Sequence, residues 1–368
     1  FFWLYSIVVS SLSVNISSSL KSSIPYIRVI LLPLVIYKIC LEDDKFLKNF
    51  LISISIVLFI LVIDSTFEFV LEKNLLGKMS TENGRISSLF NDEYILGTFI
   101  LRIFFIASAL IFYLIKDRTI KFYLLFGFIY FVSFMTIFFS GDRTPLLLFG
   151  IASFFILFYL SVKKRIKFYF IVILVLFFST ILISNQNIYD RYVTKTLNEF
   201  GSSMGINESV SFERIQIINH GDKKITFLPT HQSLWITSFR IIEEKHLFGL
   251  GNKSFKDLCK IYKISTHGCA THPHNTYVQL LVESGIIGFI IFFSIFLLLA
   301  KKVFKSTFSK NKDSGETYFL YLALFINLWP IAQTGSFFNN WNSIMYYMPV
   351  GFLLFFNSFS YKNKILKK

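Results

Sequence analysis

The sequence predicts an all-α polytopic membrane protein with about ten transmembrane helices and one large, partly helical loop outside the cytoplasm. Hydrophobic residues make up 54% of the 368 residues and charged residues only 16%, with a mean hydropathy of +0.59. Several apolar runs approach or exceed the roughly 20 residues that a helix needs to cross a bilayer. Short turns rich in lysine recur between these runs, as in other polytopic membrane proteins.

Ten apolar runs follow one another along the chain, and charged residues, glycine or proline separate them, as expected at helix ends. The first seven form an expected transmembrane bundle over residues 1–184, and the last three form C-terminal transmembrane helices over 276–368. The chain begins Phe-Phe-Trp without Met or a signal-peptide pattern, so we expect a fragment with helices missing upstream. The expected spans are residues 1–16, 24–41, 47–64, 94–115, 122–140, 146–162, 168–184, 276–300, 317–334 and 343–360.

The basic turns set the expected orientation. Lysines and arginines concentrate in alternate turns, and these turns share one side if every span is counted correctly; the positive-inside rule makes that side the cytoplasm. The net charge of +15 then reflects membrane topology rather than binding to nucleic acid. The outward turns carry Arg85, Arg143 and the long polar segment 185–275.

The segment 185–275 is too long for a simple connection, so we expect it to have structure of its own. Trp235, Phe239 and Ile242 recur at helical spacing, which predicts an amphipathic helix over 231–245 that lies on the membrane surface. Gly249-Leu-Gly251 ends this helix. It follows no strand and lacks a third glycine, so it is not a nucleotide-binding motif.

Two cysteines, Cys259 and Cys269, share this outer segment. Outside the cytoplasm such a pair favours a disulfide. The alternative is a metal site with the nearby His267, His272 and His274, but the spacing matches no standard zinc motif.

The end of the outer segment leads into an expected helix. Pro273 suits a first helical turn, because its missing N–H would be unpaired there. Asn275, Gln279 and Glu283 fall at i, i+4 and i+8, so they form one polar stripe on an otherwise apolar helix. Glu283 lies too deep to share a proton with a histidine at the helix entry, and we expect it to pair inside the bundle.

His272 and His274 lie at this helix entry. The positive end of a helix dipole favours neutral imidazole and a nearby anion. The histidines therefore suit a general base that acts on an anionic substrate. The alternative is a polar cap that only satisfies backbone N–H groups.

Three arginines are expected on the same outer side. Arg143 lies at the mouth of a span, Arg240 lies off the apolar face of the amphipathic helix, and Arg85 lies in an outer loop. For Arg143, a charge at membrane depth is costly and usually functional. The alternative is an interfacial arginine that reaches lipid headgroups or, for Arg143, pairs with Asp142.

The stretch His-Pro-His-Asn-Thr-Tyr-Val-Gln-Leu-Leu-Val-Glu-Ser-Gly-Ile-Ile-Gly over 272–288 resembles the O-antigen ligase and O-antigen polymerase superfamily of bacterial envelope polysaccharide assembly. The supporting matches span most of the chain in the order expected for the family. They are Arg85-Ile-Ser-Ser-Leu-Phe90, Ser140-Gly-Asp-Arg143, Phe239-Arg240, His246-Leu-Phe-Gly-Leu-Gly251 and Gly335-Ser-Phe-Phe-Asn-Asn-Trp341.

The resemblance implies transfer of a glycan from an undecaprenyl (polyprenyl) diphosphate carrier to an acceptor hydroxyl, without a metal or other cofactor. The reaction would take place on the periplasmic face of the bacterial inner membrane. It implies that Arg143 and Arg240, together with Arg85, hold the donor diphosphate. His274 would act as the base on the acceptor hydroxyl or contact the diphosphate, and His272, Asn275 and Glu283 would support it.

The expected partners are the lipid-linked donor, a lipid A-core or glycan acceptor, and membrane lipid. A ligase and a polymerase differ only in the acceptor, and glycan transfer to protein is a third activity of such enzymes. A transporter or flippase would also need arginines near a cavity, but it more often shows paired repeats with broken helices. A purely structural membrane protein would leave the outer arginines and the polar stripe unexplained.

Overall fold

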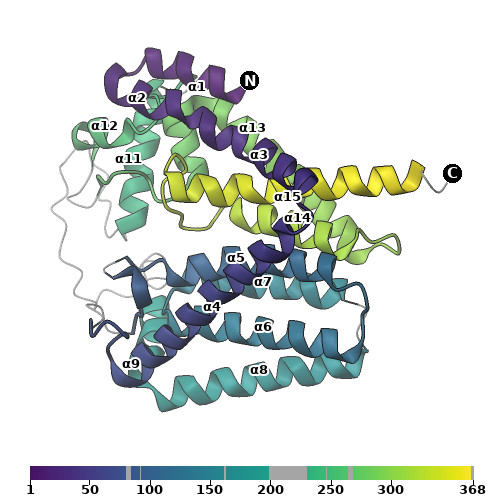
Figure 1. The fold of residues 1–368 in the computed structure, drawn as a ribbon. Coiled ribbons are helices and arrows are strands. Elements are labelled where there is room, and N and C mark those ends of the chain that lie inside the picture. Colours follow the sequence, from purple (N-terminus) through teal and green to yellow (C-terminus); the bar gives the residue numbers. More distant parts are fainter. Residues whose placement is uncertain are drawn as a thin grey trace. The chain divides into compact units, whose positions relative to one another are not determined.

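The structure is a computed structural model that describes residues 1–79, 84–91, 93–160, 163–198, 230–245, 247–263 and 268–365. In these ranges the protein is helical and contains no strand, apart from an isolated bridge between Lys73 and Met79. The fold is therefore all-α in the described ranges, as predicted (Figure 1).

The longer helices coincide with the apolar runs of the sequence. Short helices lie between some of them. In chain order the elements are α1 (Phe2–Ser11), α2 (Ile16–Ser23), η1 (Ile24–Tyr26), α3 (Ile27–Glu42), α4 (Phe46–Leu71), η2 (Ser88–Phe90), α5 (Leu96–Leu114), α6 (Ile120–Phe139), α7 (Arg143–Tyr159), α8 (Lys164–Ser184), α9 (Gln186–Tyr189), η3 (Asp190–Thr194), α11 (Thr230–Lys245), α12 (Phe255–Tyr262), α13 (Thr276–Phe308), α14 (Gly315–Asn327) and α15 (Asn340–Ile365).

Five helical stretches in the described part of the chain are long and apolar enough to cross a membrane. They are Ile16–Glu42, α4, α5, α6 and α13. This number supports a multi-pass membrane protein, while the finer count of ten spans and the outer position of the long segment stay predictions.

Two expected spans are shorter than predicted. The helix in 1–16 has only 10 residues, which at about 1.5 Å per residue is about half of a bilayer core. The helix in 317–334 has 13 residues and ends at Asn327. Pro330 follows closely, and a proline disfavours helical backbone in the residue before it.

The described chain forms two compact units, each built from segments distant in sequence. Unit 1 comprises Phe1–Ile36, Leu197–Leu298 and Leu328–Gly351. Unit 2 comprises Tyr37–Thr196, Leu299–Asn327 and Phe352–Lys368. The expected domain boundaries at residues 184 and 275 stay predictions.

The centre of unit 2 is α5, which packs against α4, α6, α7 and α14. Most of its residues are buried. Phe112 shows how tightly it packs, because its ring contacts Phe122, Phe126 and Phe319. Gly315 at the start of α14 lies directly on this ring. Helices α5 and α14 therefore form a closely packed pair.

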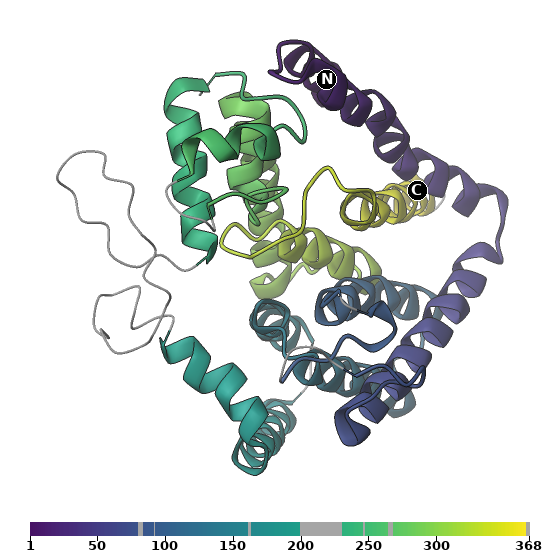
Figure 2. The ribbon, with the colours of Figure 1, turned by 90° about the vertical axis from the view of Figure 1, so that its left-hand side faces the viewer.

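Unit 1 contains an apolar core that includes part of the long polar segment. Figure 2 shows α11, α12 and the start of α13 grouped together in green. Their shared core consists of Leu234, Ile241, Leu250, Phe255, Cys259 and Val282. This part of the segment therefore has structure of its own, as predicted.

The packed face of α11 differs from the predicted apolar face. Leu234, Ser238 and Ile241 are buried, whereas Phe239 is 49% exposed. Trp235 and Ile242 pack at the border of the core. The helix carries two overlapping apolar stripes, and α12 and α13 cover the one that contains Leu234.

Candidate functional site

The N-terminus of α13 is set by Asn275. Its Oδ1 accepts hydrogen bonds from the backbone N–H groups of Tyr277 and Val278, both at 3.0 Å. Asn275 is therefore the cap, and the helix begins at Thr276. The prediction that Pro273 lies in the first turn is wrong, because His274, with φ +55°, interrupts the helical backbone after it.

The other end of the Asn275 side chain holds a distant loop. Its Nδ2 donates to the carbonyl oxygens of Pro330 at 2.7 Å and Ala332 at 3.2 Å. Gln279 continues this contact one turn later, since its Oε1 accepts from Phe337 N at 2.8 Å. The predicted polar stripe thus binds the loop 328–339 against the start of α13.

The two histidines form a pair whose ring centroids are 4.2 Å apart. His272 is buried, and its Nε2 lies 3.3 Å from the carbonyl oxygen of Thr334. A carbonyl only accepts, so Nε2 carries the proton, and in the neutral ring Nδ1 accepts from Thr271 Oγ1 at 3.0 Å. His274 is partly exposed, and its own carbonyl accepts from Thr334 N at 2.9 Å.

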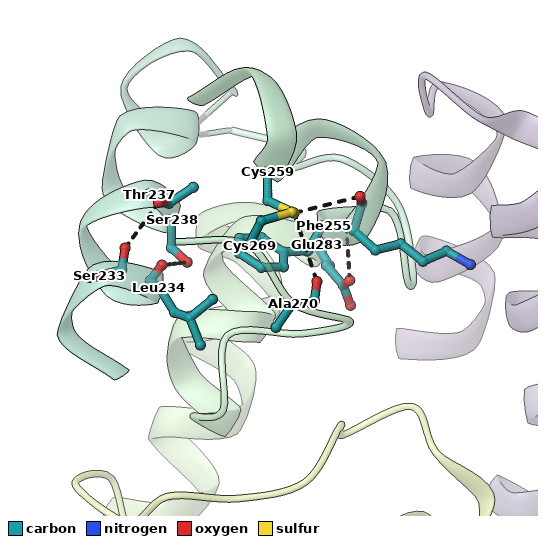
Figure 3. Close-up of a disulfide and its surroundings, with 10 residues drawn as sticks. Ser233, Leu234, Thr237, Ser238, Phe255, Cys259, Cys269, Ala270 and Glu283 are labelled. Atoms are coloured by element: carbon teal, nitrogen blue, oxygen red, sulfur yellow. Dashed lines mark hydrogen bonds between the residues drawn. A yellow bond between two sulfur atoms is a disulfide. The ribbon is translucent and has the colours of Figure 1, made fainter. Parts of the chain in front are cut away.

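Glu283 pairs inside the fold, as predicted. It is fully buried, and its Oε2 accepts from Gln279 Nε2 at 2.8 Å. Its Oε1 accepts from Phe255 N at 3.2 Å (Figure 3). Phe255 begins α12, and the first N–H groups of a helix need acceptors from outside it. Glu283 therefore anchors α12 to α13.

Helix α13 is broken at Gly285, whose φ is 65° and ψ −172°. The break leaves carbonyl groups of the preceding turn without helical partners. Backbone N–H groups of Leu250 and Gly251 bind two of them, the carbonyls of Val282 and Glu283, both at 2.9 Å. The Gly249-Leu-Gly251 segment therefore stabilises the break in α13, because its N–H groups bind the carbonyls that the break leaves free.

Cys259 of α12 and Cys269 form a disulfide with a Cα–Cα distance of 5.1 Å (Figure 3). It closes the segment that leads to His272. Because the sulfur atoms are bonded to each other, neither is a thiolate available to a metal. His267, part of the alternative metal site, lies outside the described residues.

Three arginines of unit 2 gather at the turn before α7. Arg85 donates to Asp142 Oδ1 at 2.5 Å, and its guanidinium lies 4.0 Å from the centre of the Tyr94 ring. Arg191 donates from Nε to the carbonyl of Gly141 at 3.0 Å. Arg143, the first residue of α7, donates to Thr196 Oγ1 at 3.2 Å. The alternative that Arg143 pairs with Asp142 is not what the structure shows, because Arg85 takes that position.

At this turn the backbone of Gly141 packs directly against the backbone of the loop at Gly84. Gly141 has φ +68°, and a Cβ there would lie 2.0 Å from the carbonyl oxygen of Gly84. The loop that carries Arg85 and the turn that carries Asp142 thus touch backbone to backbone. Ile86 N also donates to Ser140 O at 3.2 Å.

Several charged side chains meet at this turn. Arg85 and Arg191 lie close enough to Asp142 to act on its charge, and Arg143 follows Asp142 directly in the sequence. Burial raises the pKa of Asp142, and the charges of Arg85 and Arg191 oppose that rise. Burial and the nearby Asp142 likewise raise the pKa of Tyr192, whose hydroxyl donates to Phe138 O at 2.7 Å.

Arg191 was not predicted from the sequence. It lies in a polar segment without a recognised motif, and its nearest signal is its position seven residues after the apolar run 168–184. Arg240, which was predicted, lies partly exposed on α11. Among the described residues it has no hydrogen-bond or ion-pair partner.

Residues 128–293 match the family model for O-antigen ligase. This match confirms the resemblance to the O-antigen ligase and polymerase superfamily. A search of curated proteins found no match.

The O-antigen ligase match covers a little less than half of the chain. It includes Arg143, Arg240 and His274, while Arg85 lies before it. His274 and Arg240 belong to unit 1, and Arg85 and Arg143 belong to unit 2. That these groups form one reaction centre stays a prediction.

Proposed function

We propose that this chain is a membrane glycosyltransferase of the O-antigen ligase type. It would transfer a glycan from a polyprenyl diphosphate to an acceptor hydroxyl at the periplasmic face of the inner membrane. The single observation that carries the proposal is the O-antigen ligase match over 128–293, because it includes both Arg143 and the helix entry with His274.

The donor diphosphate binds at the arginines. Arg85, Arg143 and Arg191 bring three permanent positive charges to one turn, and such charge suits a diphosphate. Arginine also offers a forked set of donors that matches phosphate oxygens. Fixed positive charge stabilises the leaving diphosphate as the glycosidic bond breaks, a task that needs no metal. Arg240 of α11 stays a predicted further contact of the donor.

The acceptor hydroxyl is activated by His274. The proton of the hydroxyl passes to the imidazole, and the hydroxyl oxygen bonds to the anomeric carbon of the donor sugar. The bond between that carbon and the diphosphate oxygen breaks, and its electron pair leaves with the diphosphate. His272 orients this step, because its ring is fixed on both nitrogen atoms and lies against His274. Asn275 holds the helix entry and the loop 328–339 together.

The alternative function is that of a flippase, a transporter of the lipid-linked glycan, and the break in α13 bears on it. Discontinuous helices of transporters use free helix ends to bind ions or substrates. Helix α13 is broken at Gly285, but the N–H groups of Leu250 and Gly251 already occupy two of the exposed carbonyls. This arrangement favours a structural break over a transport site.

The test uses purified protein with polyprenyl-diphosphate glycan and separate acceptors, lipid A-core and a second lipid-linked glycan. His274→Ala and Arg143→Ala should each lower transfer by about 10²-fold or more, the usual effect of removing an acid–base group or a transition-state donor. Arg165→Ala, an exposed arginine at the start of α8, is the matched control and should keep full activity. Full activity in either site variant would refute the mechanism. The acceptor that is used separates ligase from polymerase.

A further inference from the structure

Helix α4 carries two buried carboxylates that the proposed reaction does not use. Asp64 and Glu68 are 0% and 3% exposed and lie one turn apart near the end of the helix. Neither forms a salt bridge with a basic residue in the described ranges. A buried carboxylate without such a partner must be stabilised by hydrogen bonds. Their hydrogen-bond donors therefore indicate what they do.

Both carboxylates bind the loop that carries Arg85. Glu68 Oε2 accepts from Ser88 N at 2.7 Å, and Oε1 accepts from Ser87 N at 3.4 Å. Asp64 Oδ2 accepts from the Ser88 hydroxyl at 2.5 Å. Its Oδ1 accepts from Leu75 N at 2.7 Å, which ties the same carboxylate to the segment that follows α4.

The backbone N–H, the carbonyl and the hydroxyl of Ser88 all form hydrogen bonds. Besides its two bonds to the carboxylates, its carbonyl accepts from Asn74 Nδ2 at 3.0 Å. Its φ is +52°, a left-handed conformation that a non-glycine residue keeps only where its surroundings impose it. The loop is therefore held in place only three residues after Arg85.

We propose that Glu68 and Asp64 are positioning residues for Arg85. They hold the backbone at Ser87 and Ser88, and this places the Arg85 guanidinium at Asp142, where the donor diphosphate would bind. The inference rests on the proposed function. Neither carboxylate touches the substrate in this role, since both act through the loop.

Carboxylates suit this task better than amides. An ionised carboxylate accepts hydrogen bonds at both oxygens, whereas an amide has one acceptor oxygen and presents N–H donors at its other end. In Glu68→Gln one of the two backbone N–H groups would therefore face another donor. The loop would lose its position while the size of the side chain stays nearly the same.

The test is a double-mutant cycle on donor kcat/KM with Glu68→Gln, Arg85→Gln and the double variant. Glu68→Gln should lower kcat/KM by about tenfold, the effect of losing one hydrogen bond to a charged group. The double variant should be no worse than Arg85→Gln alone, because Glu68 acts through Arg85. Glu72→Gln, an exposed carboxylate at the end of the same helix, is the control and should change nothing.

Hydrogen exchange supplies a readout that does not depend on transfer. Glu68→Gln should speed exchange of the backbone amides in residues 84–91, and Glu72→Gln should not. If the Glu68→Gln protein fails to fold, the Ser88→Ala variant is used in its place. Ser88→Ala removes only the hydroxyl that binds Asp64.

The outcomes separate this inference from the proposed function. The positioning role alone would be overturned if the losses in kcat/KM from Glu68→Gln and Arg85→Gln multiplied in the double variant. It would also be overturned if hydrogen exchange at 84–91 were unchanged in Glu68→Gln. An Arg85→Gln variant with normal donor kinetics would overturn the role of Arg85 in donor binding and the positioning role together. Absence of any transfer by the unmodified protein would overturn the proposed function, while the exchange result would still judge the positioning of the loop.

Discussion

Replacing Gly285 with alanine should destabilise the protein more than most single substitutions. Gly285 breaks α13 with φ 65° and ψ −172°, a region of backbone conformation that is almost restricted to glycine. An added Cβ would also lie 2.1 Å from the carbonyl oxygen of Leu247. That atom is backbone, so the segment 247–251 would have to move.

The expected loss follows from these two effects. The backbone conformation costs about 1 to 3 kcal/mol for alanine. Moving the segment breaks the bonds from Leu250 N to Val282 O and from Gly251 N to Glu283 O, each worth about 1 kcal/mol. The free energy of unfolding should therefore fall by about 3 to 5 kcal/mol.

The assay is unfolding of the purified protein in detergent, followed together with hydrogen exchange in residues 247–251. Gly150→Ala in α7 is the matched control, because nothing lies within 4 Å of the added Cβ and the residue is helical. It should raise stability by about 0.5 to 1 kcal/mol, since glycine is unfavourable inside a helix. A Gly285→Ala protein as stable as the original, with unchanged exchange at 247–251, would show that the break is not held as described.

Three further perturbations test other parts of the structure. Removing the disulfide with serine at both Cys259 and Cys269 should lower the free energy of unfolding by about 2 to 3 kcal/mol; a reductant should destabilise the original protein similarly and leave the double variant unchanged. Arg85→Gln should destabilise more at pH 7 than at pH 4, because burial raises the pKa of Asp142 and only its ionised form, present at higher pH, needs the guanidinium. Unfolding midpoints at the two pH values measure this, and an equal loss at both would contradict it. Asn275→Ala should cost about 2 to 4 kcal/mol through the lost cap and the two lost Nδ2 bonds. Asn275→Ser, which retains a capping oxygen, should recover about 1 kcal/mol of it in the same unfolding assay.

Much of the local structure could be predicted from the sequence. Each of the ten apolar runs contains a helix, although two of these helices are shorter than their run, because hydrophobic periodicity and the breaks at glycine, proline and charged residues are local properties. The polar stripe of Asn275, Gln279 and Glu283 was predictable for the same reason, since helical spacing places the three residues on one face. The pairing of Cys259 with Cys269 needed only their closeness in sequence and an expected oxidising compartment.

Other features depend on which segment covers which face. Two apolar stripes on α11 were nearly equivalent in the sequence, and packing against α12 and α13 selected the one with Leu234. The length of α14 also differed from its apolar run, because hydropathy continued past Asn327 while the backbone turned before Pro330. The hydrophobic pattern of the sequence could not tell which stripe of α11 would be buried or where α14 would end.

The sequence by itself determined where the helices form, which residues share a helix face, and the family that 128–293 matches. Only the tertiary structure decided that Arg191 joins Arg85 at the Asp142 turn, and that Glu68 holds the loop at Ser88. Arg85 and Asp142 are 57 residues apart, and Glu68 and Ser88 are 20 apart. The physical reason is that a charged side chain is stabilised by whichever donors or acceptors the fold brings to it, and no local periodicity encodes partners at such separations.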